Sequence, residues 1–305
     1  MTSIPRRNAL TLGAGAALAT VLAGSGTAHA ATPHRSDNRD AARRLAALER
    51  AHGARLGVYA HNVRTGRTVA HSADELFPMC STFKTLAVAA VLRDLDRDGE
   101  FLAKRIRYTA QDVTDAENSD VTGREVNIAN GMTVAELCDA AITFSDNCAA
   151  NLLLRELGGP TAVTRFARSV GDRVTRLDRW EPALNTAEPD RVTDTTSPYA
   201  IGRTYARLVL GDALAAADRR RLTGWLLANT TSGERFRKGI PAGWTVADKT
   251  GGGSYGTNND VGVVWTPQGA PVVMAVLTTH PRDQKAKGDN ALIAETVAVL
   301  ADALG

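Results

Sequence analysis

Residues 55–71, RLGVYAHNVRTGRTVAH, contain two extended segments joined by a tight turn. Apolar and polar residues alternate over 55–63, and extended sequence resumes at Thr68–His71 after the turn. An isolated hairpin buries little apolar surface, so it needs partner strands. The available partners are the later strand-like segments, 244–249, 260–265 and 271–279. The chain is therefore expected to build an antiparallel five-stranded sheet from segments near both of its ends.

Helical patterns fill the middle of the chain and also flank the strand segments. Apolar residues recur at helical spacing over 36–52, 85–96, 133–144, 149–157, 161–170, 198–210, 217–229 and 291–304. The expected fold class is α/β plus all-α, in which the antiparallel sheet is flanked by terminal helices and carries an inserted helical domain. We expect an α/β domain from residues 31–77 and 230–305, an all-α domain from 78–229, and a ligand site in the cleft between them.

The composition is that of an ordinary globular protein. Of the 305 residues, 44% are hydrophobic and 23% are charged, and the formal net charge is +3. This balance excludes a disordered chain, a collagen and a coiled coil. Aromatic residues make up only 5%, and no basic run interleaved with aromatic residues is present, so nucleic acid is not an expected partner.

Residues 1–30 have the pattern of an export signal. Arg6 and Arg7 precede an apolar stretch, and the small-residue sequence TAHA follows at 27–30. The paired arginines favour a twin-arginine signal. The alternative, a membrane anchor, is disfavoured because Gly and Thr interrupt an apolar stretch shorter than about 18 residues. We expect cleavage near Ala30 and a secreted protein without a stable membrane anchor.

Neither a disulfide nor a metal site is expected. The three cysteines, Cys80, Cys138 and Cys148, are scattered, and an odd number leaves at least one thiol free. No CxxC pair is present, and the six histidines form no H-x-H or H-E-x-x-H cluster. A metal-dependent hydrolase is therefore disfavoured, and no cofactor is expected.

The sequence STFK at 81–84 places Ser81 and Lys84 three residues apart, on one face of a helix. A serine hydroxyl becomes a good nucleophile when a neighbouring base takes its proton, and a lysine can be that base if burial or a nearby cation lowers its pKa. A serine at a helix start also lies beside free N–H groups that can stabilise an oxyanion. Taken alone, the pattern is more often an ordinary helix start with a capping serine.

Two further short motifs supply groups suited to substrate binding. SDN at 145–147, between two helical segments, offers a hydroxyl, a carboxylate and an amide that could relay a proton and hold a substrate amide. KTG at 249–251, where a predicted strand ends, offers a cation, a hydroxyl and a glycine that lets the backbone approach a ligand. Each motif alone is more often a helix cap or a strand exit.

A fourth motif, EPALN at 181–185, lies in a long segment with little regular pattern. Long ordered loops are often functional. The carboxylate of Glu181 and the amide of Asn185 are four residues apart and could hold one water between them. The alternative is a capped turn.

Together these motifs resemble those of the class A serine β-lactamases, whose signature is S-x-x-K, S-D-N and K-T-G in this order. E-x-x-x-N distinguishes these hydrolases from their penicillin-binding relatives. The resemblance extends over nearly the whole chain after the predicted signal, including GMTV at 131–134 and PAGW at 241–244. It implies hydrolysis of the β-lactam amide bond of penicillins and cephalosporins through a covalent acyl-serine, with antibiotic resistance as the outcome.

The resemblance also implies a role for each motif residue. Ser81 is the nucleophile, and the backbone N–H groups of Ser81 and Gly252 form the oxyanion hole. Either Lys84, or Glu181 acting through a water, takes the first proton. Glu181 and Asn185 position the water that hydrolyses the acyl-enzyme.

The remaining implied roles concern proton relay and substrate binding. Ser145 passes a proton to the departing nitrogen, and Asn147 binds the amide side chain of the substrate. Lys249 and Thr250 bind the substrate carboxylate, and Gly251 lets the strand come close to it. The two lysines of the site are expected to lower each other's pKa.

The loop that carries Glu181 has two further matches to the family. Arg179 and Asp194 bracket it, where the resemblance implies a salt bridge that closes the base of the loop. The bond between Glu181 and Pro182 corresponds to a cis peptide of the family. Without the resemblance, cis is expected at only about 5–6% of such bonds.

The sequence departs from the family pattern at three places. Asn258 stands where many members have an arginine for the substrate carboxylate, and we expect Arg235 to supply that charge instead. The usual aromatic residue of the site's rim is absent from the sequence ENS at 117–119. Cys80 precedes the nucleophile, as in carbapenem-hydrolysing members, but its usual disulfide partner position is Gly253, so that bridge is not expected.

Two other functions share the acylation chemistry. A D-Ala-D-Ala peptidase, or penicillin-binding protein, lacks the deacylating glutamate and holds its penicilloyl adduct for a long time. A non-catalytic β-lactam sensor also stops after acylation, and it normally carries a membrane segment and a cytoplasmic output. Glu181 favours the hydrolase, with a small-molecule β-lactam as its partner and a monomer as the expected state.

Overall fold

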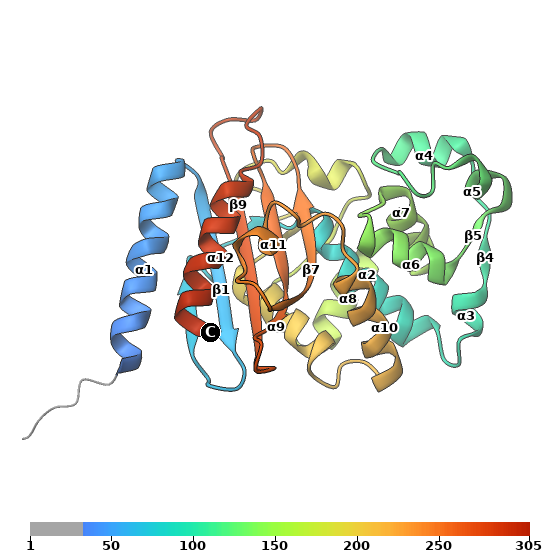
Figure 1. Ribbon diagram of the computed structural model, residues 1–305. Coiled ribbons are helices and arrows are strands. Elements are labelled where there is room, and N and C mark those ends of the chain that lie inside the picture. The colour runs from blue at the N-terminus through green and yellow to red at the C-terminus, as the bar shows by residue number, and fades with distance from the viewer. Residues whose placement is uncertain (1–32) are drawn as a thin grey trace, which may run out of the picture. The chain divides into compact units, whose positions relative to one another are not determined.

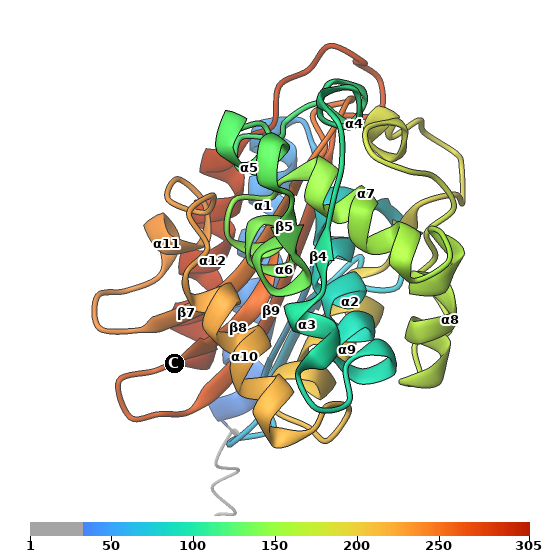
Figure 2. The same ribbon diagram turned by 90° about the vertical axis from the view of Figure 1, so that its right-hand side faces the viewer.

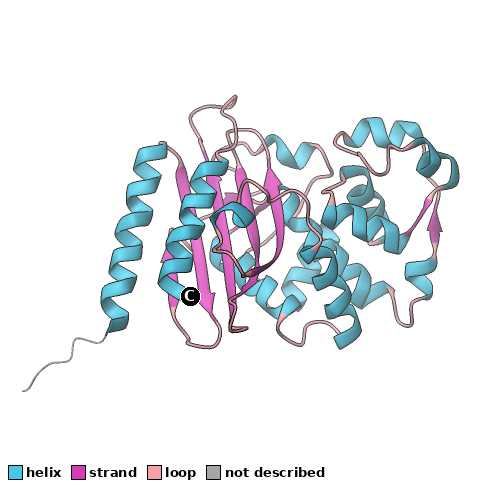
Figure 3. Cartoon of the chain, in the orientation of Figure 1, coloured by secondary structure: helices cyan, strands magenta, loops and turns pink. Residues whose placement is uncertain are grey.

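The computed structural model of the chain describes residues 33–305, and the predicted signal at 1–30 lies outside this range. Within it, a single layer of long strands is covered by helices on both faces (Figure 3). None of the helices in this range is long and apolar enough to cross a membrane.

The principal sheet has five antiparallel strands in the order β2-β1-β9-β8-β7. These are β1 (Arg55–Asn62), β2 (Thr68–His71), β7 (Thr245–Gly252), β8 (Asn258–Trp265) and β9 (Pro271–Thr279). Strand β1 pairs with β9 along its whole length, from Arg55 opposite Thr279 to Asn62 opposite Val272. The early hairpin therefore pairs with the late strands, which confirms the predicted sheet. Strand β7, which carries the KTG motif, lies at one edge.

Helices account for most of the chain between β2 and β7. The longer ones are α1 (Pro33–His52), α2 (Phe83–Ala90), α6 (Val134–Thr143), α7 (Asn147–Glu156), α8 (Thr161–Ser169), α9 (Pro198–Val209), α10 (Ala216–Leu227) and α12 (Asn290–Leu304). The shorter ones are α3 (Glu100–Ala103), α4 (Ala110–Ala116), α5 (Glu125–Asn130), α11 (Phe236–Gly239), two 3₁₀ turns, η1 (Cys80–Thr82) and η3 (Ala183–Thr186), and one π-helical turn, η2 (Val91–Leu95). The predicted fold class is confirmed.

The terminal helices cover one face of the sheet. In Figure 1, α1 and α12 lie on the side of the sheet away from most other helices. Leu45 of α1 and Leu300 of α12 are fully buried in one apolar cluster with Leu56 and Val58 of β1. Since side chains alternate along a strand, Val272 of β9 joins this cluster, whereas its neighbour on the strand faces the opposite side.

The opposite face of the sheet shares its core with the helical segment. Val273 and Leu277 of β9 belong to the same apolar cluster as Ile201 of α9 and Leu86 of α2. Seen from the helical side, α2, α6 and α7 lie in front of the sheet (Figure 2). Every residue of α2 is buried. A helix that is buried all round holds the side chains at its start in a fixed place.

The structure differs from the sequence prediction mainly in short elements. The helix predicted over 85–96 begins at Phe83 and changes to π-helical hydrogen bonding at η2. Two small antiparallel sheets, β3 (Phe77–Pro78) with β6 (Thr195–Thr196) and β4 (Arg105–Ile106) with β5 (Met132–Thr133), were not predicted. Two-residue strands have no detectable periodicity, so only their long-range pairing defines them.

The predicted domain division stays a prediction. Residues 33–305 form one compact unit. The apolar cluster that includes Val261 and Val273 of the sheet also includes Leu137 and Leu153 of the helical segment, so the two parts share a core. This shared core places the edge strand β7 beside the turn that carries the predicted nucleophile.

Candidate active site

Four segments that are distant in the sequence bring the predicted site residues together. Ser81 and Lys84 lie at the junction of η1 and α2, Ser145 and Asn147 where α7 begins, Glu181 and Asn185 in the loop between α8 and α9, and Lys249 and Thr250 on β7. Hydrogen bonds and ion pairs join each of these segments to at least one of the others. The four motifs therefore form one cluster of side chains.

Glu181 contacts both residues of the first motif. Lys84 is fully buried, and its Nζ donates to the carbonyl oxygen of Ser145 and to Asn147 Oδ1, both over 2.7 Å. The same Nζ forms an ion pair with Glu181 Oε1 at 3.1 Å. Ser81 Oγ donates to that carboxylate oxygen over 3.3 Å. Within residues 33–305, no hydrogen bond joins Ser81 Oγ directly to Lys84 Nζ, whereas one joins it to Glu181.

Ser145 lies between the two lysines. Its Oγ accepts a hydrogen bond from Lys249 Nζ over 2.9 Å and one from Lys84 Nζ over 3.4 Å. Lys249 is fully buried, and its pKa is well below the ordinary value because burial disfavours its charge and the Lys84 ammonium repels it. The backbone of Ser145 has a φ of 60°, which is uncommon for a residue other than glycine. This strained turn aims the hydroxyl at both ammonium groups.

Asn147 and Asp146 fix the turn in different ways. Asn147 Nδ2 donates to the carbonyl oxygen of Ala116 over 3.0 Å, while its Oδ1 accepts from Lys84. The Asp146 carboxylate accepts from the N–H groups of Ala149 and Thr122, over 2.8 and 2.9 Å. Asp146 therefore caps α7 and holds the preceding loop, and the helix-cap interpretation applies to this residue of the motif.

Glu181 is held at its carboxylate and at its backbone. Asn185 Nδ2 donates to Glu181 Oε2 over 2.5 Å. Asn151 Nδ2 donates to the Glu181 carbonyl oxygen over 2.9 Å, and Asn151 Oδ1 accepts from the Glu181 N–H over 3.0 Å. The sequence analysis did not identify Asn151. A signal was available, because this asparagine lies one helical turn after Asn147 on the same face of α7.

Arg179 and Asp194 close the base of the loop. Arg179 Nε lies 2.5 Å from Asp194 Oδ2, and the N–H groups of Asp178 and Arg179 donate to Asp194 Oδ1. Asp194 is 1% exposed, so this ion pair is largely shielded from water. The peptide bond between Glu181 and Pro182 is cis, as the resemblance implied.

The glycines after Thr250 allow the end of β7 to approach the backbone at Ser81 and the loop that carries Asn185. A Cβ added at Gly251 would lie 2.9 Å from the Met79 carbonyl oxygen and 3.3 Å from the Ser81 nitrogen. A Cβ added at Gly253 would lie 2.6 Å from the Asn185 carbonyl oxygen. These distances are too short for a side chain, so only glycine permits the backbone to pass so close.

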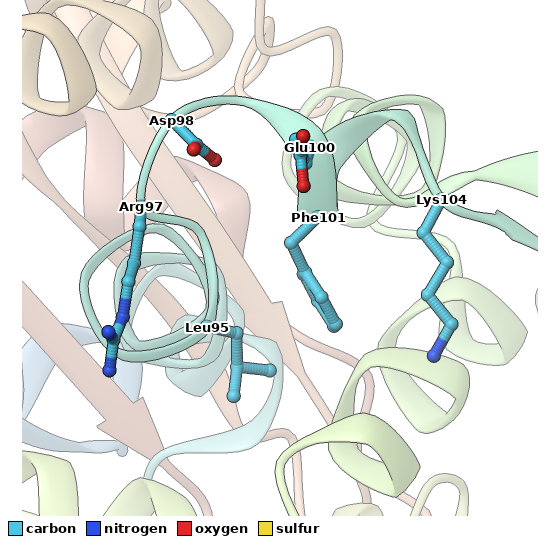
Figure 4. A pocket seen from close by; sticks show the side chains of 6 residues that line it. All are labelled: Leu95, Arg97, Asp98, Glu100, Phe101 and Lys104. Atoms are coloured by element: carbon cyan, nitrogen blue, oxygen red, sulfur yellow. The ribbon is translucent and has the colours of Figure 1, made fainter.

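The described residues offer no metal site, and one surface hollow lies away from the cluster. No group of three His, Cys, Asp or Glu side chains within residues 33–305 could hold a metal ion. A hollow of about 450 Å³ is lined by Leu95, Arg97, Asp98, Glu100, Phe101 and Lys104 (Figure 4). None of these residues belongs to the cluster around Ser81. The buried polar cluster, rather than this hollow, is the candidate active site.

Comparison with known proteins identifies the family. Residues 40–304 match the β-lactamase enzyme family. A β-lactamase of Streptomyces lavendulae is 68% identical over 300 residues, which cover 98% of this chain and 97% of that protein. A β-lactamase of Streptomyces albus G is 64% identical over 311 residues, which cover 100% of this chain and 99% of that protein. The chain belongs to the β-lactamase enzyme family.

Solved structures extend this assignment to the fold. The structure of the β-lactamase from Streptomyces albus G covers 87% of this chain and all of its own, with a TM-score of 0.86 and 68% identity. A β-lactamase structure from Desulfarculus baarsii covers 88% of this chain and 98% of its own, with a TM-score of 0.84 and 47% identity. The predicted resemblance is confirmed, and the protein is a serine β-lactamase of class A.

Hydrogen bonds hold the Arg235 side chain beside strands β7 and β8 of this β-lactamase. Its Nη1 donates to the carbonyl oxygens of Gly251 and Asn259 over 3.1 and 3.0 Å. Its Nε donates to Asn290 Oδ1 over 2.9 Å, and Asn258 Nδ2 donates to the same oxygen over 3.1 Å. Arg235 therefore lies beside Asn258, the residue that stands in the place of the usual arginine.

In this β-lactamase, Cys80 packs against Gly253, the residue that follows β7. All three cysteines are free and buried. A Cβ added at Gly253 would lie 2.9 Å from Cys80 Sγ, so the thiol occupies the space next to the glycine. Burial in apolar surroundings raises the pKa of the Cys80 thiol far above its usual range, which keeps it neutral and inert. The sequence ENS at 117–119, where the family usually has an aromatic residue at the rim of the site, contains no aromatic residue. Glu117 and Asn118 there have φ values of 55° and 35°.

Proposed function

We propose that this β-lactamase opens the ring of penicillins and cephalosporins by forming an ester on Ser81 and hydrolysing it with a water activated by Glu181. The observation that carries this proposal is the place of the Glu181 carboxylate. One of its oxygens lies 3.3 Å from Ser81 Oγ, and the other accepts the side-chain amide of Asn185. A carboxylate and an amide so close to the acylated oxygen can hold and deprotonate one water.

Acylation would use the groups around Ser81. The backbone N–H groups of Ser81 and Gly252 would stabilise the oxyanion that forms at the β-lactam carbonyl. Lys84 or Glu181 would take the Ser81 proton: Glu181 accepts a hydrogen bond from the Ser81 hydroxyl, and Lys84 forms an ion pair with the same Glu181 oxygen. Ser145, which contacts both lysines, would deliver a proton to the departing ring nitrogen.

Substrate binding would use a second set of residues in the cluster. Lys249 and Thr250 on β7 would bind the carboxylate of the substrate, with Gly251 allowing close approach. Arg235 would add positive charge, and its anchoring to β7 and β8 supports this role. Asn147 would bind the amide side chain of the substrate with its second amide hydrogen.

Other parts of the proposal concern the whole molecule. We propose an α/β lobe from residues 31–77 and 230–305 and a helical lobe from 78–229, with the site between them. Export after cleavage near Ala30 would place a monomeric enzyme outside the cell, where it destroys the antibiotic and gives resistance. The residues before 33 lie outside the described structure, so the sequence pattern alone supports export.

Turnover distinguishes the hydrolase from a D-Ala-D-Ala peptidase or a β-lactam sensor. We expect many molecules of a chromogenic cephalosporin to be hydrolysed per molecule of enzyme. E181A should release no more than one equivalent and then stop, because an ester that forms meets no activated water. Mass spectrometry of the peptide that contains Ser81 should show the adduct.

The matched control removes a carboxylate far from the cluster. Glu100 lies in the first turn of α3 and lines the surface hollow of Figure 4. E100A should hydrolyse the cephalosporin at the wild-type rate. A single burst from the wild-type protein, or full turnover by E181A, would contradict the proposed function.

A further inference from the structure

Asn229 connects the buried Asp248 with Thr231. Its Nδ2 donates to Asp248 Oδ2 over 2.8 Å. Its Oδ1 accepts from the Thr231 N–H over 3.0 Å and from Thr231 Oγ1 over 2.8 Å. A backbone N–H can only donate, so this contact establishes that the oxygen of the amide faces Thr231.

The hydroxyl groups of Thr231 and Thr250 lie 2.5 Å apart. Each hydroxyl has one hydrogen, and the amide oxygen of Asn229 has none. Because Thr231 gives its hydrogen to Asn229 Oδ1, the hydrogen between the two hydroxyls comes from Thr250. The Thr250 hydroxyl therefore donates to Thr231 in this structure, and its hydrogen is not available to a ligand.

We propose that Thr231 is a positioning residue that sets the direction of the Thr250 hydroxyl for the carboxylate of a β-lactam. This inference rests on the proposed function, in which Thr250 binds that carboxylate. A carboxylate only accepts hydrogen bonds, so Thr250 must turn its hydrogen to the substrate. Thr231 then turns its own hydrogen from Asn229 Oδ1 to Thr250 Oγ1.

The reversal leaves no buried polar group without a partner. Asn229 Oδ1 keeps the backbone N–H of Thr231, and the bond between the two hydroxyls persists with its direction changed. Asn229 and Thr250 are only 5% and 4% exposed, so both ends of this chain of bonds are largely shielded from water, while Thr231 between them is half-buried. A hydroxyl that accepts one hydrogen bond donates a stronger one, so Thr231 strengthens the bond from Thr250 to the carboxylate.

T231V tests the inference in the otherwise unchanged chain. Valine has a methyl group in the place of the hydroxyl, and carbon–oxygen contacts are ordinarily at least about 3.3 Å, so the methyl group displaces the Thr250 side chain. We expect KM for a penicillin to rise about tenfold, the size typical of weakening one hydrogen bond to a charged group, with kcat within about twofold. T231S keeps the hydroxyl and should restore KM.

The matched control is the neighbouring threonine. Thr230 Oγ1 donates to the Thr143 carbonyl oxygen over 2.8 Å, and no hydrogen bond joins it to Thr250. T230V should leave KM unchanged. If T231V does not yield a folded protein, T231A removes the hydroxyl without adding bulk and is expected to raise KM in the same direction.

The methyl ester of the same penicillin separates positioning from general damage. The ester lacks the charged carboxylate, so T231V and the wild-type protein should hydrolyse it with the same KM. An equal loss on acid and ester, or no loss on either, would overturn the proposed role of Thr231. Failure of the wild-type protein to turn over the acid would instead overturn the proposed function itself.

Discussion

Asn151 holds the backbone of Glu181 rather than its carboxylate. The amide of Asn151 donates to the Glu181 carbonyl oxygen and accepts from the Glu181 N–H, so both hydrogen bonds lie on one residue of the loop. Asn151 is placed by α7, which also carries Asn147 at its first turn. The helix therefore sets the position of the carboxylate relative to the Lys84 side chain that Asn147 contacts.

N151A should slow deacylation more than acylation. Loss of both hydrogen bonds frees the Glu181 backbone, and a displacement of 1 Å can reduce a rate by about 100-fold. We expect kcat for a chromogenic cephalosporin to fall between about 10- and 100-fold, with a visible burst of the first turnover. Stopped-flow absorbance measures both phases. N130A, at an exposed asparagine of α5, is the control, and an unchanged kcat in N151A would show that α7 does not position Glu181.

The proposed catalytic side chains could be singled out from the sequence because they occur in short motifs, whereas the residues that hold them could not. Ser81 and Lys84 are recognised by spacing, and Glu181 by its distance from Asn185. Asn151 and Thr231 are ordinary polar residues in sequence, and their roles depend on contacts with residues 30 and 19 positions away. Such contacts are set by tertiary packing, which no local pattern reports.

The loop between α8 and α9 is an element held together at its base. The Asp194 carboxylate accepts from the N–H groups of Asp178 and Arg179 and from Arg179 Nε. Its backbone carbonyl oxygen accepts from the Met79 N–H over 3.0 Å. The same residue therefore closes the loop and ties it to the segment that precedes Ser81.

D194A should destabilise the protein and impair deacylation together. Removing the buried Asp194 carboxylate weakens the compensation of the Arg179 charge and leaves the N–H groups of Asp178 and Arg179 without their acceptor, and we expect the free energy of unfolding to fall by on the order of 3 kcal/mol. E188A removes the second, more exposed partner of Arg179 and should cost less than about 1 kcal/mol. Urea denaturation measures both. Equal effects of the two substitutions would contradict the distinction between the buried and the exposed ion pair.

Long elements were predictable because each repeats its pattern several times. Strands β1 and β9 and helices α9 and α12 lie within one or two residues of their predicted bounds. Short elements depend on capping and pairing instead: Thr109 and Asp112 form a capping box at α4, and β3 exists only because Phe77 pairs with Thr196. Strand β3 leads directly into η1, which carries Ser81, so this part of the site's frame was less predictable than the long elements.

At the scale of the whole molecule, the two terminal helices close one face of the sheet and contact each other. Arg44 of α1 pairs with Asp302 of α12, although both side chains are well exposed. His52, near the end of α1, has a more sheltered contact, because its Nδ1 lies 2.7 Å from Asp289 Oδ2 and its Nε2 lies 3.5 Å from Glu295 Oε2. Asp289 also caps α12 through the N–H of Leu292.

The pairing of His52 makes the stability of this helix pair depend on pH. The hydrogen bond to Asp289 raises the pKa of His52 above its ordinary value of 6.5, against the opposing effect of burial. The folded state therefore binds the imidazolium proton more tightly than the unfolded state. This stabilisation is fully present below pH 6.5 and is lost as the pH rises through the folded pKa.

H52Q should cost more stability at pH 6 than at pH 9. His61 provides an opposite control, because burial lowers its pKa, with a smaller effect from the Arg203 charge, so its contribution is lost as the pH falls. The difference in unfolding free energy between the wild-type protein and H61Q should therefore change with pH in the reverse sense. Urea denaturation of the three proteins from pH 5.5 to 9 measures both trends, and a pH-independent cost for H52Q would show that no proton on His52 joins α1 to α12.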